Sequence, residues 1–153
     1  MTSDGIKDED WDRVHELAVE IVNASEDERL SRVYTQRLLT VLDELEEKYG
    51  ALPSILATRA DYVDDLFESI DLLKRAFETG TARNDKTNLL YISSSLASRY
   101  IQSLRDVNQG MEWLSVFRDR LSSCGDESDH REYEELSEAL RTLEAEAARP
   151  GDR

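Results

Sequence analysis

The sequence predicts an all-α protein built from antiparallel helical hairpins, and three observations support this fold class. Only two prolines and six glycines occur among 153 residues, of which 35% are charged, a composition that favours amphipathic helices over strands. Apolar residues recur three and four positions apart along most of the chain. A hairpin pattern in the middle of the chain returns about 40 residues later, as in a helical repeat protein.

The first two predicted helices form one hairpin. Apolar residues over 11–22 recur at helical spacing and predict the first amphipathic helix. Ser25 and Glu28 fit a capping box, which predicts that the second helix starts there. The apolar stripe of that helix covers residues 30–49, and Gly50 predicts its end.

The second hairpin pairs a short helix with a longer one. Pro53 suits the first turn of the short helix, which we expect to end near Tyr62. Its partner is predicted over about 65–79, with a stop near Gly80. The seam between the two helices is expected to hold larger apolar side chains, namely Leu66, Phe67, Ile70, Leu73 and Phe77.

A third pair of helices follows a polar connection. Asn84 and Asp85 are candidate caps for a helix whose apolar side reaches Leu104. Asp106 is a candidate cap for the next helix, and Gly125 predicts its end. This pair repeats the spacing of the second hairpin.

The two ends of the chain are predicted to differ from its middle. A last helix over about 129–147 has acidic residues on much of its surface, as expected of a capping element at the end of a stack. We expect residues 1–9 to be a disordered N-terminus and residues 148–153 a disordered tail. A single α-helical repeat domain is then predicted over residues 10–147.

Small and large residues of the second hairpin follow a characteristic order: Leu56, Ala57, Ala60, Ser69, Leu73 and Ala76. The order returns, with slips of one residue or less, at Leu96, Ala97, Tyr100, Gly110 and Leu114. It resembles the tetratricopeptide repeat over residues 54–121. The resemblance implies antiparallel helical hairpins stacked as a short tetratricopeptide-like solenoid of about seven helices with a C-terminal capping helix. A plain seven-helix bundle is the alternative.

The charge balance argues against several classes of partner. Asp and Glu outnumber Lys and Arg by 34 to 19, and the net charge of −15 repels nucleic-acid phosphates and anionic lipids. No apolar stretch reaches the roughly 18 residues that a membrane span needs. The first residues lack the pattern of a signal peptide, and Cys124 is the single cysteine. We therefore expect a cytoplasmic protein that binds neither nucleic acid nor membrane.

Few residues have the spacing that catalysis or metal binding requires. His15 and His130 are far apart, and Glu134, one turn from His130, gives at most a weak divalent site for which a solvated acidic helix start is the simpler explanation. No phosphate-binding glycine loop and no hydrolase or zinc motif occurs. The sequence thus predicts a protein that is not an enzyme and has no cofactor or metal.

One predicted helix, over residues 88–102, has a polar face with few charges, as in the core of partner-binding patches. In tetratricopeptide domains the first helix of each pair lines the binding groove. The alternative is that its serines are small because another helix packs closely there. The polar face and the resemblance together predict these partner-binding residues: Ser54, Thr58, Asp61, Tyr62, Asn88, Tyr91, Ser94, Ser98, Ile101 and Gln102.

These patterns predict a non-catalytic protein–protein interaction module, adaptor or chaperone-like, that binds a partner peptide or helix in a polar, tyrosine-bearing groove. A second hypothesis is an acidic inhibitor or immunity-type protein that neutralises a basic enzyme or toxin by steered association. An enzyme that uses acidic clusters, such as Asp64 with Glu68, is a third. The sequence leaves the partner and the oligomeric state open.

Overall fold

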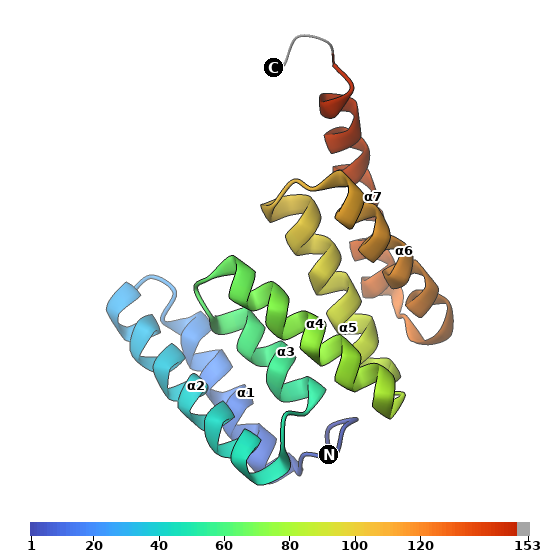
Figure 1. Cartoon of the computed structure of the whole chain (residues 1–153). Coiled ribbons are helices and arrows are strands. Elements are labelled where there is room, and N and C mark those ends of the chain that lie inside the picture. The colour runs from blue at the N-terminus through green and yellow to red at the C-terminus, as the bar shows by residue number, and fades with distance from the viewer. Residues whose placement is uncertain (150–153) are drawn as a thin grey trace. The chain divides into compact units, whose positions relative to one another are not determined.

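A computed structural model gives the fold, and the structure describes residues 1–149 (Figure 1). These residues form seven α-helices and one π-helical segment, and no strand occurs among them. The predicted all-α class is therefore confirmed. None of the described helices is long and apolar enough to cross a membrane. The predicted tail over 148–153 lies largely outside the described residues.

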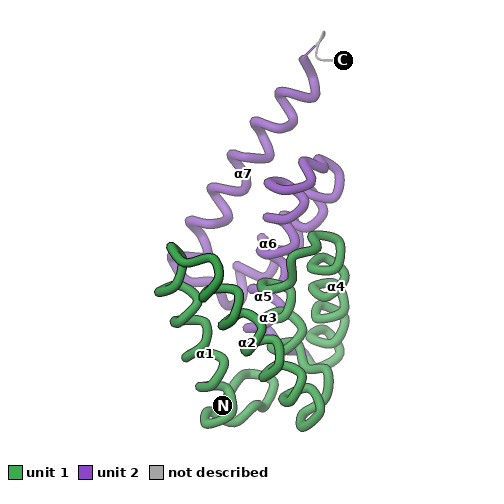
Figure 2. Tube along the Cα trace, turned by 90° about the vertical axis from the view of Figure 1, so that its left-hand side faces the viewer, with its two compact units in different colours: residues 1–83 green, residues 84–153 purple. Residues whose placement is uncertain are grey.

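The sequence predicts one domain over residues 10–147, whereas the Cα trace divides into two compact units, residues 1–83 and residues from 84 onward (Figure 2). The division falls at Asn84, whose backbone has φ +53° and ends the preceding helix. Left-handed backbone of this kind interrupts a helix and is tolerated best by asparagine and glycine.

Unit 1 consists of two helical hairpins. Its helices are α1 (Asp8–Asn23), α2 (Glu28–Tyr49), α3 (Pro53–Tyr62) and α4 (Leu66–Arg83). Each helix packs on the next along the chain: α1 on α2, α2 on α3 and α3 on α4. Contacts between sequence neighbours are typical of hairpin repeats. The core of the unit is formed by Ile6, Val14, Leu38, Val41, Leu42, Leu45, Leu52 and Ile55.

Unit 2 contains α5 (Lys86–Ser98), a π-helical segment (Arg99–Ser103), α6 (Val107–Cys124) and α7 (Glu127–Ala147). Helix α5 packs on α6, and α7 contacts both of them. Phe117 of α6 meets Tyr133 of α7 edge to face, with ring centroids 5.9 Å apart. The core of the unit is formed by Leu90, Ala97, Ile101, Leu114, Phe117, Leu121, Leu136 and Leu140.

The predicted repeat register can be compared with the helices of the two units. Leu56 of α3 and Leu96 of α5 are 40 residues apart, whereas the caps of the following helices, Asp65 and Asp106, are 41 apart. The extra residue is accommodated by the π-helical segment, since a π turn holds one residue more than an α turn. In this predicted register, the π-helical segment accounts for the slip of one residue in the sequence pattern.

Most predicted helix ends are confirmed. Asp85 accepts a hydrogen bond from the Asn88 amide at 3.2 Å, and Asp106 caps α6 in the same way. Pro53 occupies the first turn of α3, and Gly50 follows the last residue of α2 with φ +88°. Such a φ is accessible to glycine without strain.

Two predicted boundaries are wrong. Asp27, rather than Ser25, caps α2, because its carboxylate accepts from the Leu30 amide at 3.1 Å. Helix α4 also continues through Gly80 to Arg83, and Gly80 is buried within it. A single glycine weakens a helix by about 1 kcal/mol but does not by itself end one.

One predicted seam residue, Phe67, is also placed wrongly. Its side chain is 67% exposed, although the sequence pattern assigns it to the core. Successive residues of a helix are rotated by about 100°, and Phe67 points well away from the face that buries Leu73 and Ala76. The apolar character of Phe67 therefore misled the prediction.

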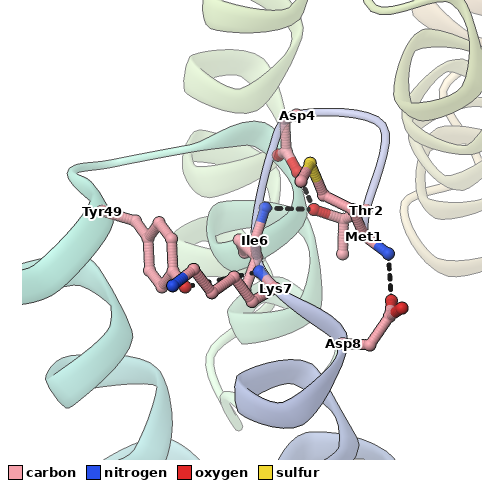
Figure 3. A network of polar contacts seen from close by, with 7 residues as sticks. All are labelled: Met1, Thr2, Asp4, Ile6, Lys7, Asp8 and Tyr49. Atoms are coloured by element: carbon pink, nitrogen blue, oxygen red, sulfur yellow. Dashed lines mark hydrogen bonds and ion pairs between the residues drawn. The ribbon is translucent and has the colours of Figure 1, made fainter.

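The predicted disorder of residues 1–9 is wrong, because this segment is packed against the helices of unit 1 (Figure 3). Ile6 is fully buried, and its amide donates to the Thr2 hydroxyl at 2.8 Å. The Lys7 amide donates to the Tyr49 hydroxyl at 3.3 Å, and the amino group of Met1 pairs with Asp8, where α1 begins.

Asp4 is the polar centre of this segment and is only 5% exposed. Its carboxylate accepts from the Ser54 amide at 2.7 Å and from the Ser54 hydroxyl at 2.8 Å, and the Thr2 hydroxyl donates to it at 2.7 Å. The N-cap residue of α3, Leu52, has no polar side chain. Asp4 therefore caps α3 from a distant part of the chain, at the end of the helix where a negative charge is favoured.

We expect Asp4→Ala to destabilise the protein by about 1.5–3 kcal/mol, because the Ser54 amide and hydroxyl lose a charged, buried acceptor. A denaturant or thermal unfolding curve measures the change. Asp12→Ala, at an exposed position of α1, is the matched control and is expected to unfold like the parent. Equal stability of the two variants would show that the Asp4 cap contributes nothing to folding.

Candidate functional site

The predicted partner-binding residues of α3 have unequal access to solvent. Ser54 is 7% exposed and bonded to Asp4, so it supports the start of α3 rather than facing a partner. Asp61 is exposed, and Thr58 and Tyr62 are partly exposed. Tyr62 also packs against the core of unit 1.

Two of the predicted residues of unit 2 are buried and are corrected to packing positions. Ser94 is 6% exposed, and its hydroxyl donates to the Tyr91 carbonyl at 3.0 Å. Ile101 is 3% exposed and belongs to the core of unit 2. Ser93 and Ser95 of the same helix are buried as well. Their small side chains are the kind that permits close packing around a buried helix, which was the alternative explanation of the serines.

The remaining predicted residues of unit 2 are accessible but engaged in local contacts. The side-chain amide of Asn88 donates a hydrogen bond to the Asp85 carboxylate at 2.6 Å, in addition to the backbone bond that caps α5. The Ser98 hydroxyl donates to the Gln102 side chain at 2.6 Å. Tyr91 is 46% exposed. Gln102 and Ile101 also line a small groove of about 320 Å³ beside α7.

The structure places a larger groove beside Tyr62, between α2 and the corner that joins α3 to α4. We call it the acidic groove, and its volume is about 750 Å³. It carries four carboxylates and one arginine. Its lining residues are Glu28, Ser31, Arg32, Thr35, Gln36, Leu39, Tyr62, Val63, Asp64, Asp65 and Glu68.

Local structure explains why acids gather at this corner. Val63 is extended after the last turn of α3, and Asp65 then caps α4 by accepting from the Glu68 amide at 2.8 Å. Acidic residues at a helix start are favoured by the helix dipole. Asp64 makes no hydrogen bond or ion pair with another described residue, so its charge faces solvent. The corner thus presents an unpaired carboxylate to solvent.

A second groove, on α1 and α2, was not expected from the sequence. We call it the arginine groove, and its volume is about 810 Å³. Four arginines, two glutamates and several apolar residues line it: Arg13, Glu16, Leu17, Arg29, Arg32, Val33, Gln36, Arg37, Thr40, Val41 and Glu44. The sequence does carry a signal for it, because residues 29–42 hold three arginines and no acid in a chain with 34 acids.

Side chains suited to chemistry are scattered over the described residues. No group of three or more His, Cys, Asp or Glu residues among them could hold a metal ion. His15 packs edge to face with Trp11 at 6.3 Å between ring centroids, and His130 is exposed. Burial, with nearby Asp129 and Glu135, raises the pKa of Glu132 on the surface of α7. These groups do not converge on one cavity.

Burial raises the pKa of Tyr62 above its ordinary value, and the nearby Asp61 carboxylate raises it further. The fold therefore favours the neutral phenol. The contribution of Tyr62 to stability is present below the pKa of an unfolded tyrosine, near 10, and is lost as the pH rises through the higher folded pKa.

We expect the tyrosinate absorbance of the parent, minus that of Tyr62→Phe, to titrate above the ordinary pKa of about 10. The parent should also lose stability more steeply than Tyr62→Phe as the pH is raised beyond that value. A difference titration at or below the ordinary pKa would contradict the partly buried position of Tyr62 in the acidic groove.

Comparison of this chain with protein-family models, with curated proteins and with solved structures gave no match. The resemblance of the α3–α4 and α5–α6 pairs to the tetratricopeptide repeat therefore stays a prediction. The function has to be argued from the grooves themselves.

Proposed function

We propose that this chain is a non-catalytic protein-interaction module, adaptor or chaperone-like, that binds a basic segment of a partner protein in the acidic groove. The observation that carries the proposal is the position of Tyr62 beside the carboxylates of the α3–α4 corner, in a groove of about 750 Å³. Tyrosine is a frequent anchor of protein interfaces, because its ring offers contact area and its hydroxyl a hydrogen bond.

The charges of the groove favour a basic partner. Glu28, Asp64, Asp65 and Glu68 face a single cation, Arg32, which pairs with Glu28 at 3.1 Å. A lysine or arginine of the partner can replace water at Asp64, and the partner's apolar side chains can pack on Tyr62 and Leu39. The net charge of −15 would also accelerate the encounter with a basic partner.

The scaffold of the groove is suited to binding without rearrangement. Arg59 of α3 forms ion pairs with Asp43 at 2.7 Å and with Glu46 at 3.0 Å, and only 16% of the Arg59 side chain is exposed. These pairs connect α3 to α2 about one helical turn beyond Tyr62 and Leu39, which line the groove. A binding site that is formed in advance avoids part of the entropic cost of association.

The second candidate function is an acidic inhibitor or immunity-type protein, which the net charge of −15 favours. Such a protein would use its whole surface potential, and its affinity would fall steeply with ionic strength. A complex anchored at Tyr62 depends instead on one groove. An experiment therefore has to separate the effect of the carboxylates in the acidic groove from the effect of the net charge of the chain.

The test measures binding of a fluorescein-labelled, lysine-rich amphipathic peptide by fluorescence anisotropy. We expect Asp64→Lys to weaken binding at least about tenfold, whereas Glu47→Lys, with the same change in net charge on the outer side of α2, should have a small effect. Tyr62→Ala should weaken binding by at least about tenfold, and Tyr91→Ala, outside the groove, should not. Melting curves identify any variant that is unfolded.

Equal losses for Asp64→Lys and Glu47→Lys, together with a steep salt dependence, would favour the inhibitor function. Parent-like binding by Tyr62→Ala would show that the acidic groove is not the binding site.

A further inference from the structure

We propose that the arginine groove is a second docking site, which binds an amphipathic helix of a partner protein with acidic residues beside its apolar stripe. The groove is formed by the α1–α2 hairpin alone. It includes neither Tyr62 nor Asp64, although Arg32 and Gln36 of α2 border both grooves. Binding at the two sites can therefore be tested separately.

The charge of the groove is opposite to that of the protein. Arg29 and Arg37 form no ion pair with another described residue, and Arg37 lies over the Tyr34 ring at 5.6 Å. Arg13 pairs with Glu44 at 2.8 Å, and both side chains remain about half exposed. Two cations without ion pairs, in a chain with an excess of 15 negative charges, leave a local site for a carboxylate. Arginine suits this role because its planar group can bind both carboxylate oxygens.

The floor of the groove is apolar, which argues for a protein segment rather than a small anion. Val33, which is 42% exposed, lines the same groove as Val41 and Leu17. Val41 belongs to the core of unit 1, and Leu17 packs against that core. A phosphate or a nucleic-acid backbone would leave these side chains in water, and the net charge would repel it. An apolar stripe of a partner would cover them.

The length of the groove suits a short helix. Its α2 side extends from Arg29 to Glu44, which at 1.5 Å per residue spans roughly 22 Å, or about four turns of a partner helix. Apolar residues recur every three to four positions on such a helix, and acids beside them can reach Arg29 and Arg37. Docking of an amphipathic helix in a groove between two helices is a common mode of recognition.

The experiment has to distinguish this partner helix from the acidic helix α7 of a second copy. Helix α7 in the groove would make the chain self-associate through the same arginines. The experiment below therefore includes the oligomeric state of the parent as one of its readouts.

The probe is a labelled synthetic helical peptide with a stripe of leucine and phenylalanine flanked by glutamates. Its length of about 16 residues is close to the roughly 15 residues that the groove accommodates. A second peptide carries lysines in place of the glutamates. We expect the acidic peptide to bind the parent, and the double variant Arg29→Glu, Arg37→Glu to bind it at least about tenfold more weakly. The control Arg131→Glu, Arg141→Glu makes the same change in net charge on the exposed surface of α7 and should bind like the parent.

The apolar floor is tested by Val33→Ser, for which we expect a loss of about threefold or more. Val19→Ser, at a 57% exposed position outside the groove, is the matched control and should have no effect. Melting curves of all variants verify folding. The proposal is overturned if the two arginine pairs weaken binding equally, if the acidic peptide does not bind the parent, or if Val33→Ser binds like Val19→Ser. It is also overturned if the parent dimerises and the groove variant is monomeric, because the occupant would then be a second copy.

Discussion

Unit 1 depends on the hydrogen bonds that the Asp4 carboxylate accepts from Ser54 at the start of α3. The first turn of a helix has amides without partners, and Leu52 cannot satisfy them at this end of α3. Asp4 does so from 50 residues away in the sequence and is itself almost fully buried. The same contact holds the N-terminal segment in place, so that Ile6 enters the core shared by α1, α2 and α3. The hairpins of unit 1 are thereby held by the chain's first residues as well as by their own packing.

Helix α2 lines one side of both grooves. One part of its surface lies beside the acidic corner of α3 and α4, and another lies beside α1 and carries the arginines. An amphipathic helix on one core would normally leave a single solvated face. At 22 residues, α2 is the longest helix among the described residues, and its solvated surface is divided between sites of opposite charge. If both proposals hold, one scaffold binds two partner segments of opposite charge, at sites that meet only at Arg32 and Gln36.

Much of the fold could be predicted from the sequence, because helix periodicity, proline and aspartate caps depend on residues close together in the chain. The Asp4 cap could not be predicted, since its partner Ser54 is distant in sequence and nothing near Asp4 indicates burial.

The candidate functional site is less predictable from the sequence than the fold. Tyr62 does line a groove, whereas the serines around Ser94 are small because they pack, and a polar face alone does not distinguish these cases. The arginine groove does not follow from the net charge of −15, because that charge describes the chain as a whole, whereas residues 29–42 hold three arginines and no acid.

An NMR titration of the ¹⁵N-labelled parent with an acidic and a lysine-rich amphipathic peptide tests whether the chain has two separate partner sites. We expect the acidic peptide to shift amides near Leu17 and Val33 and the basic peptide to shift amides over residues 62–68. We also expect each peptide to bind when the other is saturating. Two separate sites are contradicted if both peptides shift the same amides, if one displaces the other, or if the shifts are spread over the acidic surface of α7.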